Sequence, residues 1–264
     1  MDTIRVSCVQ FQPKMGDVEW NLNTIAGYFE QGRIMGSQVL VFPELIVQGY
    51  LPQIIESTAE LVSGHACQLL TELSRKYGIY AVVGMAERNN GKIFNSAILF
   101  GPEGKIIGVY RKVHLWSTET VYFAHGSEYP VFDTDFGKMG MWICYDTRFP
   151  EVARSYAIQG ARIAFIPTAW LARDIEHWKL AVSSRAMDNF IFVCGADEIF
   201  EMDFHQSHGA SIIVDPDGQI IASAEIMKEG LITADIDLRR GDELRELIPV
   251  LRDRQPQTYH ALGQ

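Results

Sequence analysis

Paired cysteines, long apolar runs and a basic bias are all missing from this sequence. Its cysteines are far apart and form no Cys-x-x-Cys pair, which argues against a disulfide framework or a zinc ribbon. No apolar run approaches the roughly 18 residues of a membrane span, so we expect no membrane partner. No basic region followed by an apolar stretch opens the sequence, which predicts a cytoplasmic protein. The formal net charge of −10 argues against nonspecific binding of nucleic acid, which needs a basic patch.

Signatures of several cofactor-dependent and hydrolytic classes are also absent. The sequence has no glycine-rich phosphate loop of the Walker or dinucleotide type and no Gly-x-Ser-x-Gly motif of serine hydrolases. His205 and His208 are spaced as a possible metal pair, but no convincing further ligands accompany them. We therefore predict neither a metal nor an organic cofactor.

What the sequence does contain is an alternation of strand and helix patterns over 264 residues, 47% of them hydrophobic. No Pro/Gly/Ser-rich linker divides this series, so we predict one α/β domain spanning residues 1–264. The predicted strands are Ile4–Phe11, Val39–Phe42, Ile79–Ala86, Ile93–Phe100, Lys105–Tyr110, Met139–Ile143, Ile163–Ile166, Ile191–Gly195, Ala210–Val214 and Gln219–Ala224. The predicted helices are Asn21–Ile34, His65–Tyr77, Pro150–Ile158 and Glu176–Asn189.

An internal similarity extends this prediction. The hairpin pattern Ala97–Ile107 resembles Ser211–Ile221, and Val41-Phe42-Pro43 resembles Phe165-Ile166-Pro167. Two similar halves indicate two similar sheets related by a pseudo-twofold axis, each with its own helices. Face-to-face packing would give a four-layer α-β-β-α sandwich. Short repeats of common hairpin turns also arise by chance, which is the simpler alternative.

A cysteine and a glutamate follow apolar strands, at the strand ends where α/β proteins bind ligands. After Cys144 a short polar turn leads to a helix near Pro150, and a nucleophile at such a turn faces the ligand beside backbone N–H groups that can hold an oxyanion. Taken alone, Cys144 is equally well interpreted as a buried structural thiol. Glu44 follows the strand Val39–Phe42, where partial burial would raise its pKa towards that of a general base. A surface turn is the simpler alternative for a lone glutamate.

Two further charged residues lie downstream of the predicted strand Lys105–Tyr110. Lys112 can hold an oxyanion and lower the pKa of a cysteine thiol, although in isolation a solvated lysine is the default interpretation. Glu119 can orient Lys112 or a substrate, and its default is likewise a surface carboxylate.

Together these residues resemble the nitrilase superfamily of carbon–nitrogen hydrolases, whose members carry a Glu–Lys–Cys triad. The motifs that carry the resemblance appear in the family's order: Phe42-Pro43-Glu44, Tyr110-Arg111-Lys112-Val113-His114-Leu115, Ile143-Cys144-Tyr145-Asp146 and Arg148-Phe149-Pro150-Glu151. The context Cys-Tyr-Asp is similar to the amidase branches, whereas nitrilases commonly have Cys-Trp-Glu. The resemblance runs over nearly the full sequence.

The resemblance implies roles by position. Cys144 would form a thioester, Glu44 would act as general base, and Lys112 with the Tyr145 backbone N–H would hold the oxyanion. Glu119 matches a second carboxylate that positions lysine or substrate. The aromatic residues Tyr50, Trp116, Tyr145 and Trp170 are candidates for lining the substrate pocket, although aromatics are more often core residues. The family also implies a homodimer or higher homo-oligomer, with the tail Leu247–Tyr259 as an interface arm.

The implied reaction is hydrolysis of a small amide, of the omega-amidase or aliphatic-amidase type, to an acid and ammonia. Several alternatives stay open at this level. The same fold serves nitrilases and N-carbamoyl amino acid hydrolases, and a thioester can also be passed to an amine by an acyltransferase. A binding protein with an inactive site is a further alternative, which the intact set of Glu44, Lys112 and Cys144 disfavours.

Overall fold

Two six-stranded β-sheets lie at the centre of the structure, a computed structural model that describes residues 2–202 and 205–263. The terminal residues of the predicted domain, Met1 and Gln264, lie outside this described part. The first sheet has the order β14-β1-β2-β3-β4-β5 and the second the order β13-β12-β9-β8-β7-β6. The strands of the first sheet are β1 (Thr3–Gln10), β2 (Val39–Val41), β3 (Tyr80–Asn89), β4 (Lys92–Gly101), β5 (Lys105–Arg111) and β14 (Gly230–Asp237). The second sheet contains β6 (Phe132–Thr134), β7 (Gly137–Met141), β8 (Ile163–Thr168), β9 (Phe192–Asp197), β12 (Ile212–Val214) and β13 (Ile220–Ser223).

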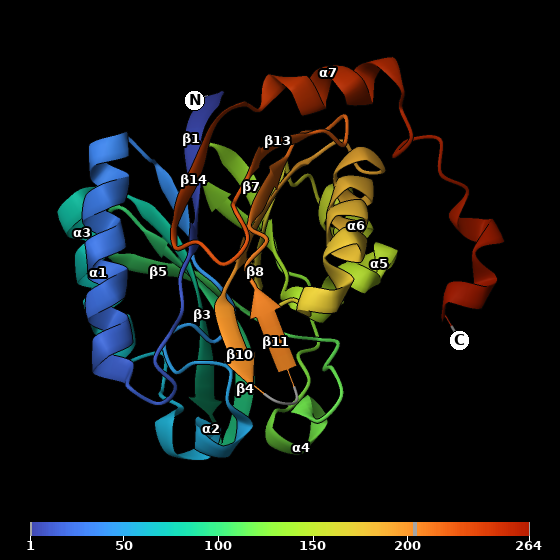
Figure 1. Cartoon of the computed structure of the whole chain (residues 1–264). Helices are drawn as coiled ribbons and strands as arrows, with labels where there is room; N and C mark the ends of the chain where they lie inside the picture. The colour runs from blue at the N-terminus through green and yellow to red at the C-terminus, as the bar shows by residue number, and fades with distance from the viewer. Residues whose placement is uncertain (1, 203–204, 264) are drawn as a thin grey trace.

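Helices cover the outer face of each sheet, so the layers follow the predicted order α-β-β-α (Figure 1). Helices α1 and α3 lie against the first sheet, and α5 and α6 lie against the second (Figure 1). A two-stranded ribbon, β10 (Ile199–Met202) with β11 (His205–His208), extends from one end of the sandwich. The α-helices are α1 (Val18–Met35), α2 (Pro52–Thr58), α3 (His65–Tyr77), α4 (Glu119–Tyr122), α5 (Pro150–Ile158), α6 (Ile175–Met187) and α7 (Arg239–Leu247). Short 3-10 helices are η1 (Cys144–Arg148), η2 (Ala172–Asp174), η3 (Pro256–Thr258) and η4 (His260–Gly263).

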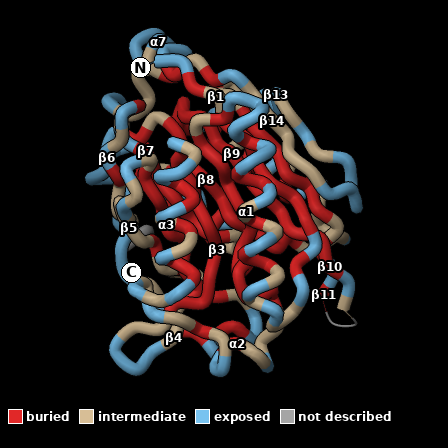
Figure 2. Tube along the Cα trace, turned by 90° about the vertical axis from the view of Figure 1, so that its left-hand side faces the viewer, coloured by how far each residue is buried: buried red, intermediate tan, exposed pale blue. Residues whose placement is uncertain are grey.

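Strand β2 shows how the sequence produces this layering. Its side chains alternate between the two faces of the sheet, as in any strand. Val39 and Val41 join the hydrophobic cluster between the two sheets, whereas Leu40 joins the cluster beneath α1 and α3. Both faces are therefore apolar, and the strands at the centre of the sandwich are buried throughout (Figure 2).

The two sheets repeat one arrangement. Strands β1, β2 and β3 run parallel and are followed by the antiparallel hairpin β4–β5. Strands β7, β8 and β9 likewise run parallel and are followed by the antiparallel β12 and β13. The two segments that look alike in the sequence are these hairpins, so the predicted pseudo-twofold halves are confirmed.

Strand β14 was not predicted, and it changes how the halves are joined. It pairs antiparallel with β1 along eight residues, so the chain returns from the second half to complete the first sheet. The equivalent strand of the second sheet is β6, which pairs antiparallel with β7. The prediction also missed β6, β10, β11, α2, α4 and α7, whose patterns are short or strongly polar.

Local signals predicted several element ends correctly. Helix α3 ends at Tyr77, and Gly78 caps it with a φ of +67°, a conformation that glycine adopts without strain. The strand predicted at Met139–Ile143 ends two residues early, because the Ile143 N–H donates to the Asp146 carboxylate instead of to a neighbouring strand.

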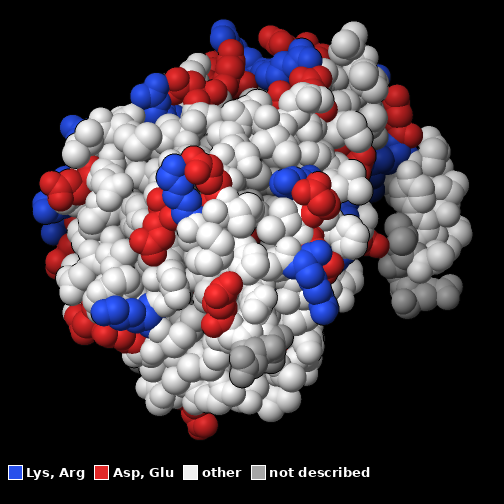
Figure 3. Space-filling model, in the orientation of Figure 1, with Lys and Arg blue, Asp and Glu red and all other residues white. Residues whose placement is uncertain are grey.

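Charges on the surface are mixed in sign. On the face shown in Figure 3, charged side chains gather over α7, where Arg239 pairs with Asp237 and Arg240 pairs with Asp217. Among the described residues, no helix combines the length and the apolar character needed to cross a membrane.

Candidate active site

The carboxyl ends of strands from both sheets meet at one end of the sandwich, and the predicted catalytic residues follow these ends. Glu44 follows β2, Lys112 follows β5 and Cys144 follows β7. Strand β5 is antiparallel to β4, which is antiparallel to β3, so its carboxyl end lies at the same edge as those of β2 and β3. The Glu44 N–H donates to the Thr168 carbonyl at the end of β8, at 3.5 Å, and joins the two sheets there.

Lys112 lies between two carboxylates. Its Nζ is 2.7 Å from Glu44 Oε1 and 2.8 Å from Glu119 Oε1. All three side chains are buried, with at most 3% of any of them exposed. The default interpretations of a solvated lysine and a surface Glu119 are therefore wrong. Lys112 directly follows β5 and Glu119 is the first residue of α4, so the short segment between them brings the two side chains together.

The Glu119 carboxylate is also bonded on both of its oxygens. The Tyr50 hydroxyl donates to Oε1 at 2.8 Å, and the Trp116 backbone N–H donates to Oε2 at 2.7 Å. Glu119 thereby connects Lys112 to two residues of the pocket wall. This position suits a residue that orients the ammonium.

Burial and charge act in opposite directions on the pKa values of this cluster. Burial raises the pKa of Glu44, although the Lys112 ammonium opposes the shift. Burial alone would lower the pKa of Lys112, but the carboxylates of Glu119 and Glu44 outweigh it and raise that pKa. The lysine is therefore held as an ammonium ion, while Glu44 becomes a stronger base than an exposed glutamate.

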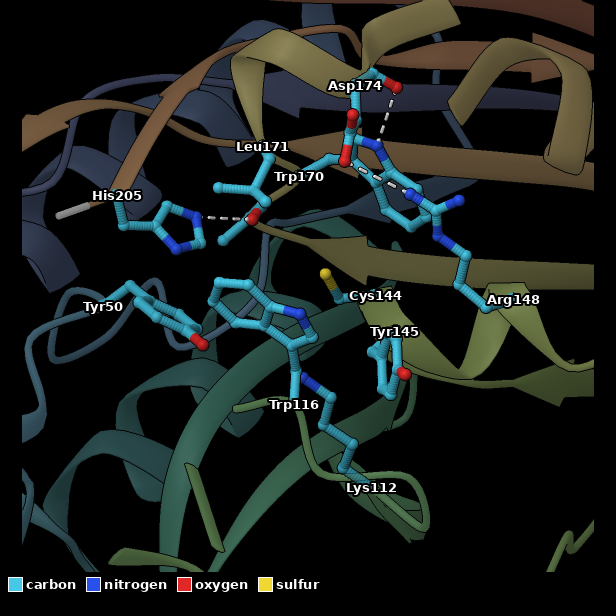
Figure 4. A pocket seen from close by; sticks show the side chains of 11 residues that line it. Tyr50, Lys112, Trp116, Cys144, Tyr145, Arg148, Trp170, Leu171, Asp174 and His205 are labelled. Atoms are coloured by element: carbon cyan, nitrogen blue, oxygen red, sulfur yellow. Dashed lines mark hydrogen bonds and ion pairs between the residues drawn. The ribbon is translucent and has the colours of Figure 1, made fainter. Parts of the chain in front are cut away.

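Cys144 occupies a tight turn between β7 and α5. It begins η1 with a φ of +43°, in the left-handed region that non-glycine residues seldom adopt. Residues held in such conformations cluster at functional sites. The turn places Cys144 at the centre of the pocket residues, with Tyr50 and His205 on one side and Tyr145 and Arg148 on the other (Figure 4).

The Lys112 ammonium lowers the pKa of the Cys144 thiol as expected, but it does not set the net direction of the shift. Burial raises the pKa of Cys144 well above its usual value, and the Glu44 carboxylate adds to this rise. Lys112 acts in the predicted direction but is outweighed. The resting thiol is therefore protonated, and its use as a nucleophile requires a base that removes the proton as a substrate approaches.

Asp146 joins the turn that begins at Cys144 to the segment around Lys112. Its carboxylate accepts the Ile143 N–H at 3.1 Å and the Tyr110 hydroxyl at 2.7 Å. It also accepts the His114 backbone N–H at 2.9 Å. Asp146 is fully buried, and these bonds connect the two segments that carry Cys144 and Lys112. Its role was not predicted, although Asp146 lies within the motif that contains Cys144.

A pocket of about 330 Å³ opens onto Cys144 and Lys112. All four predicted pocket aromatics line it: Tyr50, Trp116, Tyr145 and Trp170. The remaining lining residues are Arg148, Ala169, Leu171, Asp174 and His205. A volume of this size suits a small organic molecule rather than a polymer.

The pocket carries one charged pair that the sequence did not indicate. Arg148 lies 3.4 Å from Asp174 and stacks over the Trp170 ring at 4.9 Å. The Arg148 side chain is 38% exposed, so part of its guanidinium is available to an anion. Figure 4 shows this pair on the opposite side of Cys144 from His205.

Behind the pocket lies a second pair of acids, Asp197 and Glu198. Burial raises the pKa of Asp197 to about 8, and burial raises that of Glu198 well above its usual value. Asp197 Oδ1 accepts the Trp170 N–H at 2.9 Å and the Ser207 hydroxyl at 3.0 Å. Within the described residues, neither oxygen of Glu198 has a hydrogen-bond partner. Sequence patterns did not reveal this pair, because an acid after a strand is usually exposed.

Within residues 2–202 and 205–263, no group of three or more His, Cys, Asp or Glu side chains could hold a metal ion. His205 Nε2 lies 3.0 Å from the Ala169 carbonyl, and burial lowers the pKa of His205 to about 4. This histidine is therefore a neutral, hydrogen-bonded residue of the pocket wall.

Comparison with known proteins gives a consistent result. The family model of carbon-nitrogen hydrolases matches residues 5–246. A probable nitrilase of Schizosaccharomyces pombe is 35% identical over 270 residues, which cover 97% of each chain. An omega-amidase of Xenopus laevis is 33% identical and covers 98% of each chain. A 2-oxoglutaramate amidase of Bacillus subtilis is 34% identical, covering 96% of this chain and 98% of its own.

A solved structure from Saccharomyces cerevisiae has the same fold. It is described as a member of branch 10 of the nitrilase superfamily, and it superimposes with a TM-score of 0.87 at 30% identity. The match covers 97% of both chains. The similarity therefore includes both sheets and the end of the sandwich where the pocket lies.

Proposed function

Because the chain belongs to the carbon–nitrogen hydrolase family, we propose that it is an amidase that converts a small amide to a carboxylic acid and ammonia through a cysteine thioester. One observation carries the proposal. A buried ammonium, Lys112, is bonded to both Glu44 and Glu119 beside a pocket that exposes Cys144. This set supplies a base, a cation and a nucleophile in one place.

Acylation uses Glu44 as the base. As Cys144 attacks the amide carbon, Glu44 takes the thiol proton, since burial has raised the pKa of both groups. The Lys112 ammonium and the Tyr145 backbone N–H stabilise the negative oxygen of the tetrahedral intermediate. Glu44 then passes its proton to the nitrogen, the C–N bond breaks, and ammonia leaves a thioester on Cys144.

Deacylation repeats these steps with water. Glu44 removes a proton from a water molecule, whose oxygen attacks the thioester carbon. Collapse of the second intermediate releases the carboxylic acid, and the proton returns to the Cys144 sulfur. Glu119 positions Lys112 throughout, because it bonds the ammonium and contacts no reacting atom in this scheme.

The pocket supports an amide whose far end carries a carboxylate. Arg148 offers a partly exposed guanidinium beside the aromatic wall, at the other side of Cys144 from His205. Relatives described as omega-amidase and 2-oxoglutaramate amidase support the same substrate class. We expect Arg148→Met to raise KM about tenfold for monoamides of dicarboxylic acids and to leave neutral amides little changed. An equal rise in KM for both kinds of amide would show that Arg148 does not recognise a substrate carboxylate.

The reaction is tested by ammonia release from a panel of small amides, nitriles and N-carbamoyl amino acids. We expect amides to be the best substrates, with an acyl adduct on Cys144 visible by mass spectrometry. Cys144→Ala should fold normally and release no ammonia, and wild-type turnover by this variant would exclude the mechanism. Preferred cleavage of nitriles or carbamoyl compounds would instead favour those alternatives, and product amides formed with added amines would indicate an acyltransferase.

The proposal extends to the domain organisation, the location and the assembly of the chain. We propose one domain over residues 1–264, a cytoplasmic location, to which its four free cysteines are suited, and a homodimer or higher homo-oligomer. Apolar residues of the tail support the last proposal, since Leu247 and Ile248 are 76% and 49% exposed. Sedimentation that finds only a 29.8 kDa species at micromolar concentration would contradict it.

A further inference from the structure

The side chain of Asn95 on β4 lies between the two carboxylates that share Lys112. Its Nδ2 donates to Glu44 Oε1 at 2.7 Å and lies 3.4 Å from Glu119 Oε1. The Lys112 backbone N–H donates to the Asn95 carbonyl at 2.8 Å. Asn95 is fully buried, and it bonds both carboxylates through its side chain and Lys112 through its backbone.

These bonds make the two oxygens of Glu44 unequal. Oε1 accepts from both Asn95 and Lys112, whereas Oε2 accepts only the Ala169 N–H, at 3.0 Å, among the bonds of the described residues. A carboxylate oxygen has about two acceptor sites, so the open site of Glu44 is on Oε2. Ala169, whose N–H binds Oε2, lines the same pocket as Cys144, so Oε2 is bonded to a residue of the pocket that holds the thiol.

We propose that Asn95 is a positioning residue of the reaction, which holds Glu44 Oε1 so that Oε2 faces the thiol proton, and which keeps Glu44 in the ionised form that a base requires. This inference deepens the proposed amidase function and rests on it. The mechanism has two chemically different oxygens on one carboxylate. Oε1 is held by fixed donors, and Oε2 carries the proton between thiol, ammonia and water.

The oxygen of the Asn95 side-chain amide supports a functional role for its Nδ2 donor. Asn95 Oδ1 has no hydrogen-bond partner among the described residues, although it is buried. An unpartnered buried oxygen destabilises the fold, so the amide is not explained by stability alone. Its bond to Glu44 also lowers the pKa of that carboxyl and so opposes the effect of burial.

The test is the pH dependence of Cys144 alkylation by iodoacetamide, measured beside kcat/KM for an amide. Asn95→Leu has a similar shape but no donor, so the pKa of Glu44 should rise. We expect the acidic limb of both profiles to move up by about one pH unit, with KM little changed. Asn95→Asp keeps the shape more closely and replaces the donor by an acceptor, so its limb should move at least as far. It decides the question if Asn95→Leu does not fold.

Ser96→Ala is the matched control. Ser96 is the next residue of β4 and is equally buried, but its hydroxyl donates to Glu87, away from the cluster. Its acidic limb should match the wild type. Unshifted limbs in both Asn95 variants, or an equal shift in Ser96→Ala, would overturn the inference. Absence of amide turnover in the wild-type protein would instead contradict the proposed function, and the alkylation profiles would still decide the role of Asn95.

Discussion

Two groups of buried acids lie at the same end of the sandwich, and they differ in their neighbouring charges and hydrogen bonds. Glu44 and Glu119 share the Lys112 ammonium, at 2.7 and 2.8 Å, and each of their oxygens accepts at least one hydrogen bond. Within the described residues, no cation is among the groups that shift the pKa values of Asp197 and Glu198, and both oxygens of Glu198 are unpartnered. Burial raises the pKa of both Glu44 and Glu198, and of these two only Glu44 has a cation, Lys112, that opposes the rise.

The difference separates two uses of a buried carboxyl group. A cation beside a buried carboxyl favours its ionised form, which a base must have before it takes a proton. A carboxyl without a cation keeps its proton, since ionisation in an apolar site is costly. Residue type alone therefore does not distinguish a base from a structural acid. The neighbouring cation does.

The largest effect is expected from Lys112→Met, which makes the first group resemble the second. Two carboxylates then share a buried site without a cation, so we expect the variant to lose about 3–5 kcal/mol of unfolding free energy. Ammonia release should fall at least about 10³-fold, because the oxyanion loses its main partner and Glu44 keeps a proton. Urea unfolding and an ammonia assay measure the two losses. Unchanged stability would show that Lys112 does not neutralise this group.

Neutral variants of the two acids should separate their roles. Glu44→Gln removes the base of both half-reactions, so kcat should fall by about 10²–10⁴-fold and Cys144 alkylation should slow as well. Glu119→Gln should reduce amide turnover while Cys144 alkylation stays near normal, because this residue positions Lys112. Both variants require a folding control by circular dichroism. If Glu44→Gln keeps activity while Glu119→Gln loses thiol reactivity, the roles are reversed.

Asp197, in the second group, should make the free energy of unfolding depend on pH. The pKa of Asp197 is raised to about 8 in the folded protein, from an ordinary value of 3.8. The folded state therefore binds a proton that the unfolded state has released, so this contribution is complete below about pH 4 and is lost as the pH rises through about 8. Urea unfolding between pH 5 and 9 should show this decline.

Asp197→Asn is the matched variant for that measurement. Its Oδ1 can still accept the Trp170 N–H and the Ser207 hydroxyl, but the side chain no longer titrates. We expect a flatter pH dependence of stability than in the wild type. An equally steep decline in the variant would assign the effect to another group.

The smallest effect is expected from Tyr50→Phe, which removes one donor from Glu119 and leaves Lys112 in place. Loss of a hydrogen bond to a charged group should cost about 1.5 kcal/mol of unfolding free energy. The reduction in kcat should stay within about tenfold, because Glu119 keeps its bonds to Lys112 and Trp116. A loss as large as that of Lys112→Met would mean that Tyr50 itself contacts the reacting atoms.

Elements with strong local signals were predicted well. Helices α3 and α5 have their predicted bounds, and the hairpin β4–β5 lies where its turn residues indicated. Short elements were missed, since a four-residue helix such as α4 carries no measurable period. Strand β14 was missed because no local feature of the sequence indicates that it pairs with β1, which lies 220 or more residues earlier.

The sequence by itself determined which groups are available: a thiol after β7, an amine after β5 and a carboxyl after β2, in motifs that identify the family. Only the tertiary structure decided what these groups are. It buried Lys112 between two carboxylates, raised the pKa of the Cys144 thiol instead of lowering it, and brought Asn95 against Glu44. The physical reason is that burial and electrostatic interaction depend on distances in space. Segments far apart in the chain meet here because strands pair within the first sheet and the second sheet, which carries Cys144, packs against it.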